Sequence, residues 1–313
     1  AWTPDTELGI EEFGNLRFLP IVLLIVPAMH LAGWGRPALI GGLAAGFLIG
    51  NAVQALHAWA AVGGGPEVLD FGRKAGRISG WWDPAVAGTL LTAALGLHLP
   101  PALMGQGRTR WLGIAAASAT LLGLIATGSR GGWIASGLLV ALVGAIAFVR
   151  AARADQRRGR ALAALGVLVV VLAAGGLAAR GAIAHRIGEA RSEVAAALAG
   201  DYDSDVGARL AMKRAALVAF AEHPVRGVGT GGYGPWTRDH AEMGVEPHDH
   251  AHDTLLHVAA SHGIVGVVLL VGVAAAGLWE GLRWARRSGL GSYGAGPLFA
   301  LIGLILVSPF DTL

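Results

Sequence analysis

The sequence predicts an all-α protein: a polytopic bundle of transmembrane helices with a large helical loop on one face. The composition is 54% hydrophobic and only 14% charged, whereas soluble domains carry about a quarter charged residues. Apolar stretches recur near the roughly 20 residues that a helix needs to cross hydrocarbon. Arginines gather in a few short connectors between these stretches, a distribution typical of membrane proteins with a fixed orientation.

The apolar stretches predict eight spans, and their glycine and alanine content favours close packing between helices. The basic connectors 105–110, 150–160 and 283–287 are expected to face the cytoplasm. Together with Arg36 that face carries 11 Lys or Arg against two acids. The predicted spans are 15–34, 38–62, 84–104, 111–128, 131–149, 161–179, 254–282 and 292–310.

This alternation divides the chain into three parts: six spans over 1–179, an extracytoplasmic loop subdomain over 180–253, and two more spans over 254–313. The chain lacks cysteine, which excludes disulfides and thiolate chemistry. The net charge of +3 is small, so we expect membrane lipids rather than nucleic acid as partners. The missing first Met and the abrupt end lead us to expect a fragment.

The long loop holds the polar residues of greatest interest. An amphipathic helix over Ile183–Ala199 is expected to lie at the membrane interface. After an acidic break at Asp201–Asp205, typical of a helix start, a second helix over Ala208–Glu222 carries Arg209 and Lys213 four residues apart on one face.

Arg130 lies between two predicted spans, in the sequence Gly-Ser-Arg-Gly-Gly-Trp. A charge at the end of a span often extends only to the lipid headgroups. An isolated arginine on the face that is poor in positive charge is also a candidate functional residue. The flanking glycines would allow a large substrate to approach its guanidinium closely.

Three cations precede the third span: Arg73, Lys74 and Arg77. The tryptophans that follow them are typical of an aromatic belt at the membrane interface, which does not account for the cations. With Arg130 and Arg209 these residues could form a pocket for phosphate groups, which arginine binds with two hydrogen bonds.

His248, His250 and His252 alternate along the chain, with Asp249 and Asp253 beside them. In an extended segment all three imidazoles would point the same way. The cluster is consistent with a metal site, with a general base and its supporting residues, or with an ordinary polar loop that enters a span.

At these residues the chain resembles the O-antigen ligase / O-antigen polymerase family of bacterial surface-glycan enzymes. The matching pieces occur in the family's order over about residues 70–270, and Asp253 departs from the asparagine usual there. They are Arg77-Ile-Ser-Gly with Asp83-Pro84, Gly128-Ser-Arg-Gly-Gly-Trp133, Arg209-Leu, His223-Pro, Gly227-Val-Gly-Thr-Gly-Gly-Tyr233, His250-Ala-His-Asp and Gly263-Ile-Val-Gly266.

The resemblance implies a GT-C-like fold in the bacterial cytoplasmic membrane, with a periplasmic active site. It implies transfer of a glycan from undecaprenyl pyrophosphate to lipid A-core, to another lipid-linked glycan, or to a protein hydroxyl. No metal, nucleotide sugar or other cofactor is implied. Family members generally have more than eight spans, which again suggests a fragment.

The chemistry of such a transfer needs positive charge near the departing phosphates and a base near the acceptor hydroxyl. We therefore predict His252 as the base of a metal-independent, inverting glycosyltransferase, with Arg130 and Arg209 as the other catalytic residues. Arg77, Arg73, Lys74, His250 and Lys213 are predicted to bind substrate. These residues are expected to meet on the extracytoplasmic face. The alternative is a transporter or metal-binding protein that uses the histidine cluster.

Overall fold

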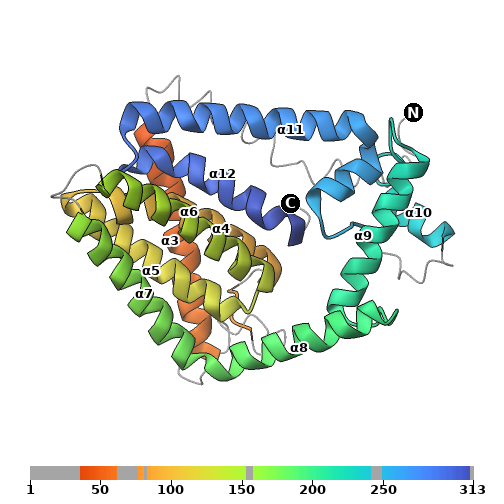
Figure 1. Cartoon of the computed structure of the whole chain (residues 1–313), viewed down its shortest axis with the longest axis horizontal. Helices are drawn as coiled ribbons and strands as arrows, with labels where there is room; N and C mark the ends of the chain where they lie inside the picture. The colour runs from red at the N-terminus through yellow and green to blue at the C-terminus, as the bar shows by residue number, and fades with distance from the viewer. Residues whose placement is uncertain (1–35, 62–76, 81–82, 153–157, 241–248, 311–313) are drawn as a thin grey trace. The chain divides into compact units, whose positions relative to one another are not determined.

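The computed structural model describes residues 36–61, 77–80, 83–152, 158–240 and 249–310, and helices dominate them (Figure 1). Two short 3-10 turns, Tyr293–Ala295 and Ser308–Phe310, flank the last helix. The α-helices are α3 Arg36–Ala61, α4 Pro84–Met104, α5 Gly107–Thr127, α6 Arg130–Ala152, α7 Arg158–Ala178, α8 Arg180–Leu198, α9 Asp205–Glu222, α10 Tyr233–Asp239, α11 Thr254–Ser288 and α12 Gly296–Val307.

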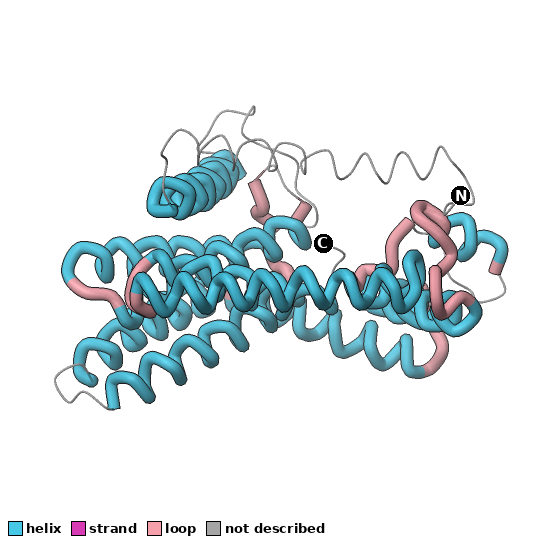
Figure 2. Tube along the Cα trace, turned by 90° about the horizontal axis from the view of Figure 1, so that it is seen from above, coloured by secondary structure: helices cyan, strands magenta, loops and turns pink. Residues whose placement is uncertain are grey.

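The predicted class, an all-α membrane protein, is confirmed. Figure 2 shows helices and loops without a strand in the described part of the chain. Within that part, five helical segments are long and apolar enough to cross a membrane: α4, α5, α6, α11 and the segment Tyr293–Phe310. The pair Leu162–Ala178 and Arg180–Leu198, bent by 79°, would make a sixth. Of the eight predicted spans, the first, 15–34, lies outside the described residues.

Helix boundaries depart from the predicted spans at three places that matter for the site. α5 begins at Gly107, so Arg108 and Arg110 belong to its first turn and not to a connector. α6 begins at Arg130, which therefore is the first helical residue. α11 contains a break at Gly263 (φ 61°, ψ −158°), which the apolar pattern did not predict because glycine and its neighbours are all compatible with a continuous span.

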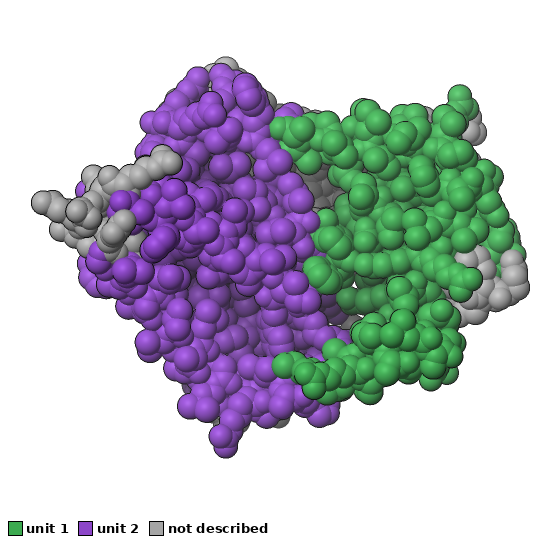
Figure 3. Space-filling model, in the orientation of Figure 1, with its two compact units in different colours: residues 1–35, 187–275, 308–313 green, residues 36–186, 276–307 purple. Residues whose placement is uncertain are grey.

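The chain divides into two compact units, coloured separately in Figure 3. In the described part of the chain, unit 1 comprises residues 187–275 and 308–310, and unit 2 comprises residues 36–186 and 276–307. Unit 2 is built around α4, which is almost wholly buried and packs against α5, α6 and α12. Its side chains Leu95, Leu97 and Leu99 are inaccessible to solvent or nearly so.

Close approach between the helices of unit 2 depends on glycine, as the composition predicts. A β-carbon at Gly96 of α4 would lie 2.3 Å from the carbonyl oxygen of Phe299 in α12. A β-carbon at Gly113 of α5 would lie 2.5 Å from the amide nitrogen of Ala102. Such contacts bring backbones together and increase dispersion contacts, which hold membrane helices together where the hydrophobic effect cannot.

Unit 1 has a smaller core between α9, α10 and the start of α11. Alanines on one face of α9 are buried beside Tyr233 and Trp236 of α10 and Ala260 of α11. Small residues on α9 leave room for these two large aromatic side chains, so the volumes on the facing surfaces are complementary. This core fixes the orientation of α9, and with it the face that carries the cations.

Candidate functional site

α9 begins where the acidic break predicts, and its cap is well defined. The Ser204 hydroxyl accepts a hydrogen bond from the Gly207 amide at 3.1 Å, which satisfies one of the amides that a helix start leaves free. Asp205 lies in the first turn, where a carboxylate interacts favourably with the helix dipole. The helix ends at Glu222, before His223-Pro224, as predicted.

Arg209 and Lys213 lie one turn apart on α9 and contact the same chain segment. The Arg209 guanidinium donates a hydrogen bond to the carbonyl of Phe310 at 3.0 Å. The Lys213 ammonium donates to the carbonyl of Pro309. The predicted shared face of these two cations is thus confirmed, and both act on carbonyls at the end of a helical segment, where positive charge is favourable.

Asp253 links this pair to the start of α11. One carboxylate oxygen accepts a hydrogen bond from the Leu256 amide at 3.1 Å and so caps the helix. The other lies 3.2 Å from the Lys213 ammonium, and both side chains are partly shielded from solvent. The ion pair brings α9 to the residue that directly follows His252.

The histidine pair occupies the segment before this cap. The rings of His250 and His252 are 4.3 Å apart between centroids and tilted by 60°, so the two imidazoles do lie together as the alternation predicts. His252 has φ 48°, a left-handed conformation that few residues other than Gly, Asn, Asp and His adopt. His248 lies outside the described residues. In the part that the structure describes, no three His, Cys, Asp or Glu side chains are grouped as metal ligands.

The glycine-rich turn after Pro224 packs its backbone directly on the break in α11. The amides of Val228 and Gly229 donate to the carbonyls of Ala260 and Ser261 at 2.8 and 2.9 Å. A β-carbon at Gly227 would lie 2.3 Å from the Ser261 carbonyl carbon, and one at Gly263 would lie 2.4 Å from the Val225 carbonyl carbon. Both glycines also have positive φ, so the motif serves close backbone contact here.

Tyr233 completes the packing of unit 1. Its hydroxyl donates a hydrogen bond of 2.7 Å to the carbonyl of Met212 in α9. Its ring meets His257 of α11 edge to face, with centroids 5.6 Å apart. Burial raises the pKa of Tyr233 above its usual value, because ionisation would leave a charge away from water. The residue that ends the glycine motif therefore joins three helices.

In unit 2, the segment that carries Arg77 is held by buried polar side chains of α3. The Gln54 amide group donates to the carbonyls of Ile78 and Gly123, at 2.7 and 2.8 Å. The His57 Nδ1 accepts a hydrogen bond from the Gly80 amide at 3.1 Å. The Ile78 amide in turn donates to the carbonyl of Ala126 at 3.0 Å. These bonds fix the segment against the end of α5.

Arg77 and Arg130 both lie beside the turn between α5 and α6. Gly128 ends α5 with φ 63°, and a β-carbon there would lie 3.4 Å from Cγ of Arg77. Ser129 follows, and its hydroxyl accepts a bond from the Gly132 amide at 3.3 Å. Arg130 then opens α6. The short connector expected between these two spans is therefore the two-residue turn Gly128-Ser129; Arg77 packs beside it, and Arg130 follows it.

The predicted site residues thus fall into two clusters. Unit 1 brings together Arg209, Lys213, His250 and His252, and unit 2 brings together Arg77 and Arg130. Arg73 and Lys74 lie outside the described residues.

Several residues of these clusters were not predicted from the sequence. Gln54 and His57 stand in an apolar stretch, and a polar residue there was the available signal. Asp253 stood beside the histidines in the sequence, but neither its ion pair with Lys213 nor its helix cap was predicted. The Pro309 and Phe310 carbonyls gave no signal, since any residue supplies a carbonyl.

Each cluster has a distinct chemical capacity. Two arginines at one turn offer planar donors suited to phosphate oxygens. The imidazoles beside Asp253 offer ring nitrogens that can donate or accept hydrogen bonds. No curated protein matches the chain. A sequence profile described as O-antigen ligase matches residues 114–271, about half of the chain's 313 residues. This segment contains Arg130 and all four residues of the unit 1 cluster.

Proposed function

The chain belongs to the O-antigen ligase family, and from this membership we propose that it transfers a glycan from undecaprenyl pyrophosphate to an acceptor hydroxyl. Membership implies a membrane enzyme of the glycosyltransferase kind that acts on lipid-linked glycans. The proposed acceptor is lipid A-core, a second lipid-linked glycan or a protein hydroxyl. The proposed location is the bacterial cytoplasmic membrane, with the reaction on the periplasmic face.

The observation that carries the proposal is that the cationic face of α9 lies close to the His250–His252 segment, because Lys213 contacts Asp253, the residue after His252. Both elements lie inside the matched part of the chain. A transfer from a diphosphate requires positive charge and a base near each other.

In the proposed reaction, His252 takes the proton of the acceptor hydroxyl, and that oxygen attacks the anomeric carbon. A new glycosidic bond forms as the bond from that carbon to the pyrophosphate oxygen breaks, and undecaprenyl pyrophosphate leaves with the electron pair. Direct displacement inverts the anomeric centre. Arg130 and Arg209 stabilise the charge that develops on the phosphates, while Arg77, Lys213, His250 and the sequence-predicted Arg73 and Lys74 bind substrate.

General chemistry supports this assignment of roles. Pyrophosphate is a good leaving group, so the reaction needs charge stabilisation more than an acid on the departing oxygen. No metal is part of the proposed step, because arginine can supply the positive charge that a metal would otherwise supply.

The experiment is glycan transfer by the purified chain in detergent with EDTA, from an undecaprenyl-pyrophosphate-linked glycan. We expect Arg130→Ala and His252→Asn each to abolish turnover. Asparagine is chosen because it tolerates the positive φ of His252 while removing the imidazole.

The matched control is His223→Asn, a histidine of unit 1 at the exposed end of α9. It should leave turnover unchanged. Near-normal turnover in both Arg130→Ala and His252→Asn would refute the assigned roles. Turnover that disappears in EDTA and returns with zinc would favour a metal-dependent reading.

A further inference from the structure

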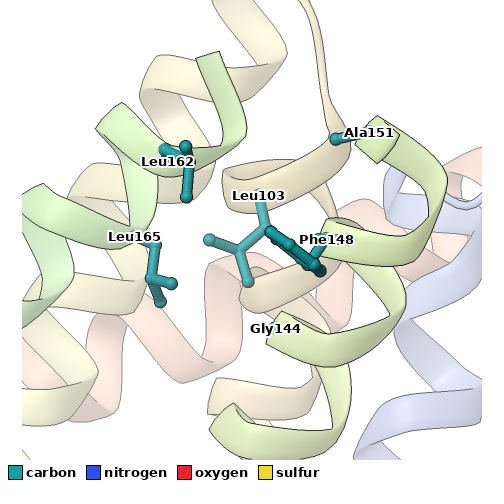
Figure 4. A pocket seen from close by; sticks show the side chains of 7 residues that line it. Leu103, Gly144, Phe148, Ala151, Leu162 and Leu165 are labelled. Carbon is teal, nitrogen blue, oxygen red and sulfur yellow. The ribbon is translucent and has the colours of Figure 1, made fainter. Parts of the chain in front are cut away.

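Unit 2 has an apolar recess between α4, α6 and α7 that the transfer reaction does not use. Its empty volume, counted together with the open space at its mouth, is about 310 Å³. Figure 4 shows Leu103 between the side chains from α6 and the leucines of α7. The lining residues are Leu103, Gly144, Ala147, Phe148, Ala151, Leu162 and Leu165.

The recess opens on the outer surface of unit 2. Leu103 is 4% exposed, whereas Phe148 and Leu162 at the rim are 57% and 53% exposed. α4 and α6 are both apolar enough to cross a membrane, so an opening between such helices faces hydrocarbon. An apolar recess in that position suits an acyl chain, because methylene groups would fill space that no side chain fills.

Positive charge surrounds the end of the bundle where the recess lies. Arg150 is exposed in the last turn of α6, directly before the lining residue Ala151. Arg158, the first residue of α7, precedes the lining residue Leu162 by one helical turn. Residues 105–110 and 150–160 contain seven arginines against one acid, Asp155. Basic sites between helices at a membrane surface attract anionic lipid headgroups.

We propose that this recess is a binding site for an anionic phospholipid, with one acyl chain between α6 and α7 and the phosphate group at the basic end of these helices, near Arg150. The apolar lining of the recess and the positive charge near its mouth suit the two parts of that molecule. The site lies on the basic ends of the helices, so its occupancy is independent of the proposed transfer reaction.

The structure supplies a substitution that fills the recess without disturbing the fold. A β-carbon at Gly144 would meet nothing within 4 Å, so Gly144→Leu places a side chain into open space and raises helix propensity. Gly137, two turns earlier on α6, is also free of neighbours within 4 Å but does not line the recess. Gly137→Leu is therefore the matched control.

The experiment is native mass spectrometry of the purified chain in detergent, titrated with phosphatidylglycerol or with phosphatidylcholine of the same acyl chains. For the unsubstituted chain we expect tighter retention of phosphatidylglycerol. Arg150→Gln and Arg158→Gln should each weaken it about fivefold, the equivalent of about 1 kcal/mol per charge, and leave phosphatidylcholine unchanged. Gly144→Leu should weaken retention of phosphatidylglycerol about tenfold by excluding methylene groups, while Gly137→Leu should not.

Three results would overturn the proposal. Equal retention of the two lipids would show that no anionic headgroup is recognised. Equal behaviour of Gly144→Leu and Gly137→Leu would show that the acyl chain lies elsewhere. A change from a dimer mass to a monomer mass in Gly144→Leu alone would show that a second copy of the chain occupies the recess.

Discussion

At the residue scale, Asp253 has two separable functions. One carboxylate oxygen caps α11, and the other pairs with Lys213. An asparagine would keep the cap but could not form the ion pair.

We therefore expect Asp253→Asn to lower the free energy of unfolding by at most about 1 kcal/mol, as for a partly exposed ion pair. Asp253→Ala should cost about 1 kcal/mol more, since the cap is lost as well. Transfer activity should survive in Asp253→Asn and fall in Asp253→Ala. Denaturant unfolding measures the stability of each variant, and a turnover assay on the same preparation measures its transfer activity. Equal losses in the two variants would show that the cap contributes little.

Tyr233 connects pH to the stability of unit 1. Its pKa is raised by burial, whereas the unfolded chain ionises near its ordinary value of about 10. Between those two pKa values the unfolded state loses a proton that the folded state keeps. This contribution to stability is therefore complete below about pH 10 and is lost progressively as the pH rises from that value to the raised pKa of the folded state.

Replacing the phenol tests this account. Tyr233→Phe removes the hydrogen bond to the Met212 carbonyl and should lower the free energy of unfolding by about 1–2 kcal/mol at neutral pH. It should also make thermal stability less sensitive to pH above about pH 9 to 10. Thermal unfolding of both proteins across this pH range checks the prediction. An alkaline loss as steep as in the unsubstituted chain would assign the effect to other groups.

At the scale of elements, side chains of α3 hold the segment that contains Arg77 by hydrogen bonds to the backbone of that segment. Gln54 touches the carbonyls of Ile78 and Gly123 and no group of the proposed reaction. It acts through Arg77, whose position depends on the neighbouring Ile78. Gln54 is thus a positioning residue, and its loss should weaken donor binding more than it slows the chemical step.

For Gln54→Leu we expect a stability loss of about 2 kcal/mol, from two carbonyls left without this donor. We also expect a raised KM for the lipid-linked donor with little change in kcat. Asn51→Ala, one turn earlier, is the control, because Asn51 donates a hydrogen bond to Thr120 of α5. Steady-state kinetics of the two variants distinguish a change in KM from a change in kcat. An equal rise in KM for both variants would indicate general loosening of α3.

At the scale of the whole molecule, charge predicts how the chain crosses the membrane. Basic residues gather at 105–110, 150–160 and 283–287, while most acids belong to the other predicted face. The absence of cysteine makes this orientation directly testable, since any thiol introduced is the single reactive one.

We expect Asp203→Cys, in the exposed start of the loop before α9, to react with an impermeant maleimide on intact cells. Gln106→Cys, between α4 and α5, should react only after the membrane is opened. Both positions are exposed to solvent within their own units. Labelling of the two positions under the same conditions would contradict the predicted orientation, and with it the face on which the reaction is proposed.

The sequence by itself determined the fold class, the helix α4 to its end residues, and the two cations on one face of α9. These features follow from composition and periodicity along a short stretch, so neighbouring residues contain the information. It also predicted that His250 and His252 lie together, as two of three alternating histidines with His248, because alternation along the chain is a local property.

Only the tertiary structure decided which groups these residues contact. Arg209 binds a carbonyl 101 residues away, and no local pattern marks one carbonyl among many. The break at Gly263 exists because the turn at Val225 approaches too closely for a β-carbon. Gln54 matters because α3 packs beside the Arg77 segment. Each depends on a contact between distant parts of the chain, which packing creates and periodicity does not encode.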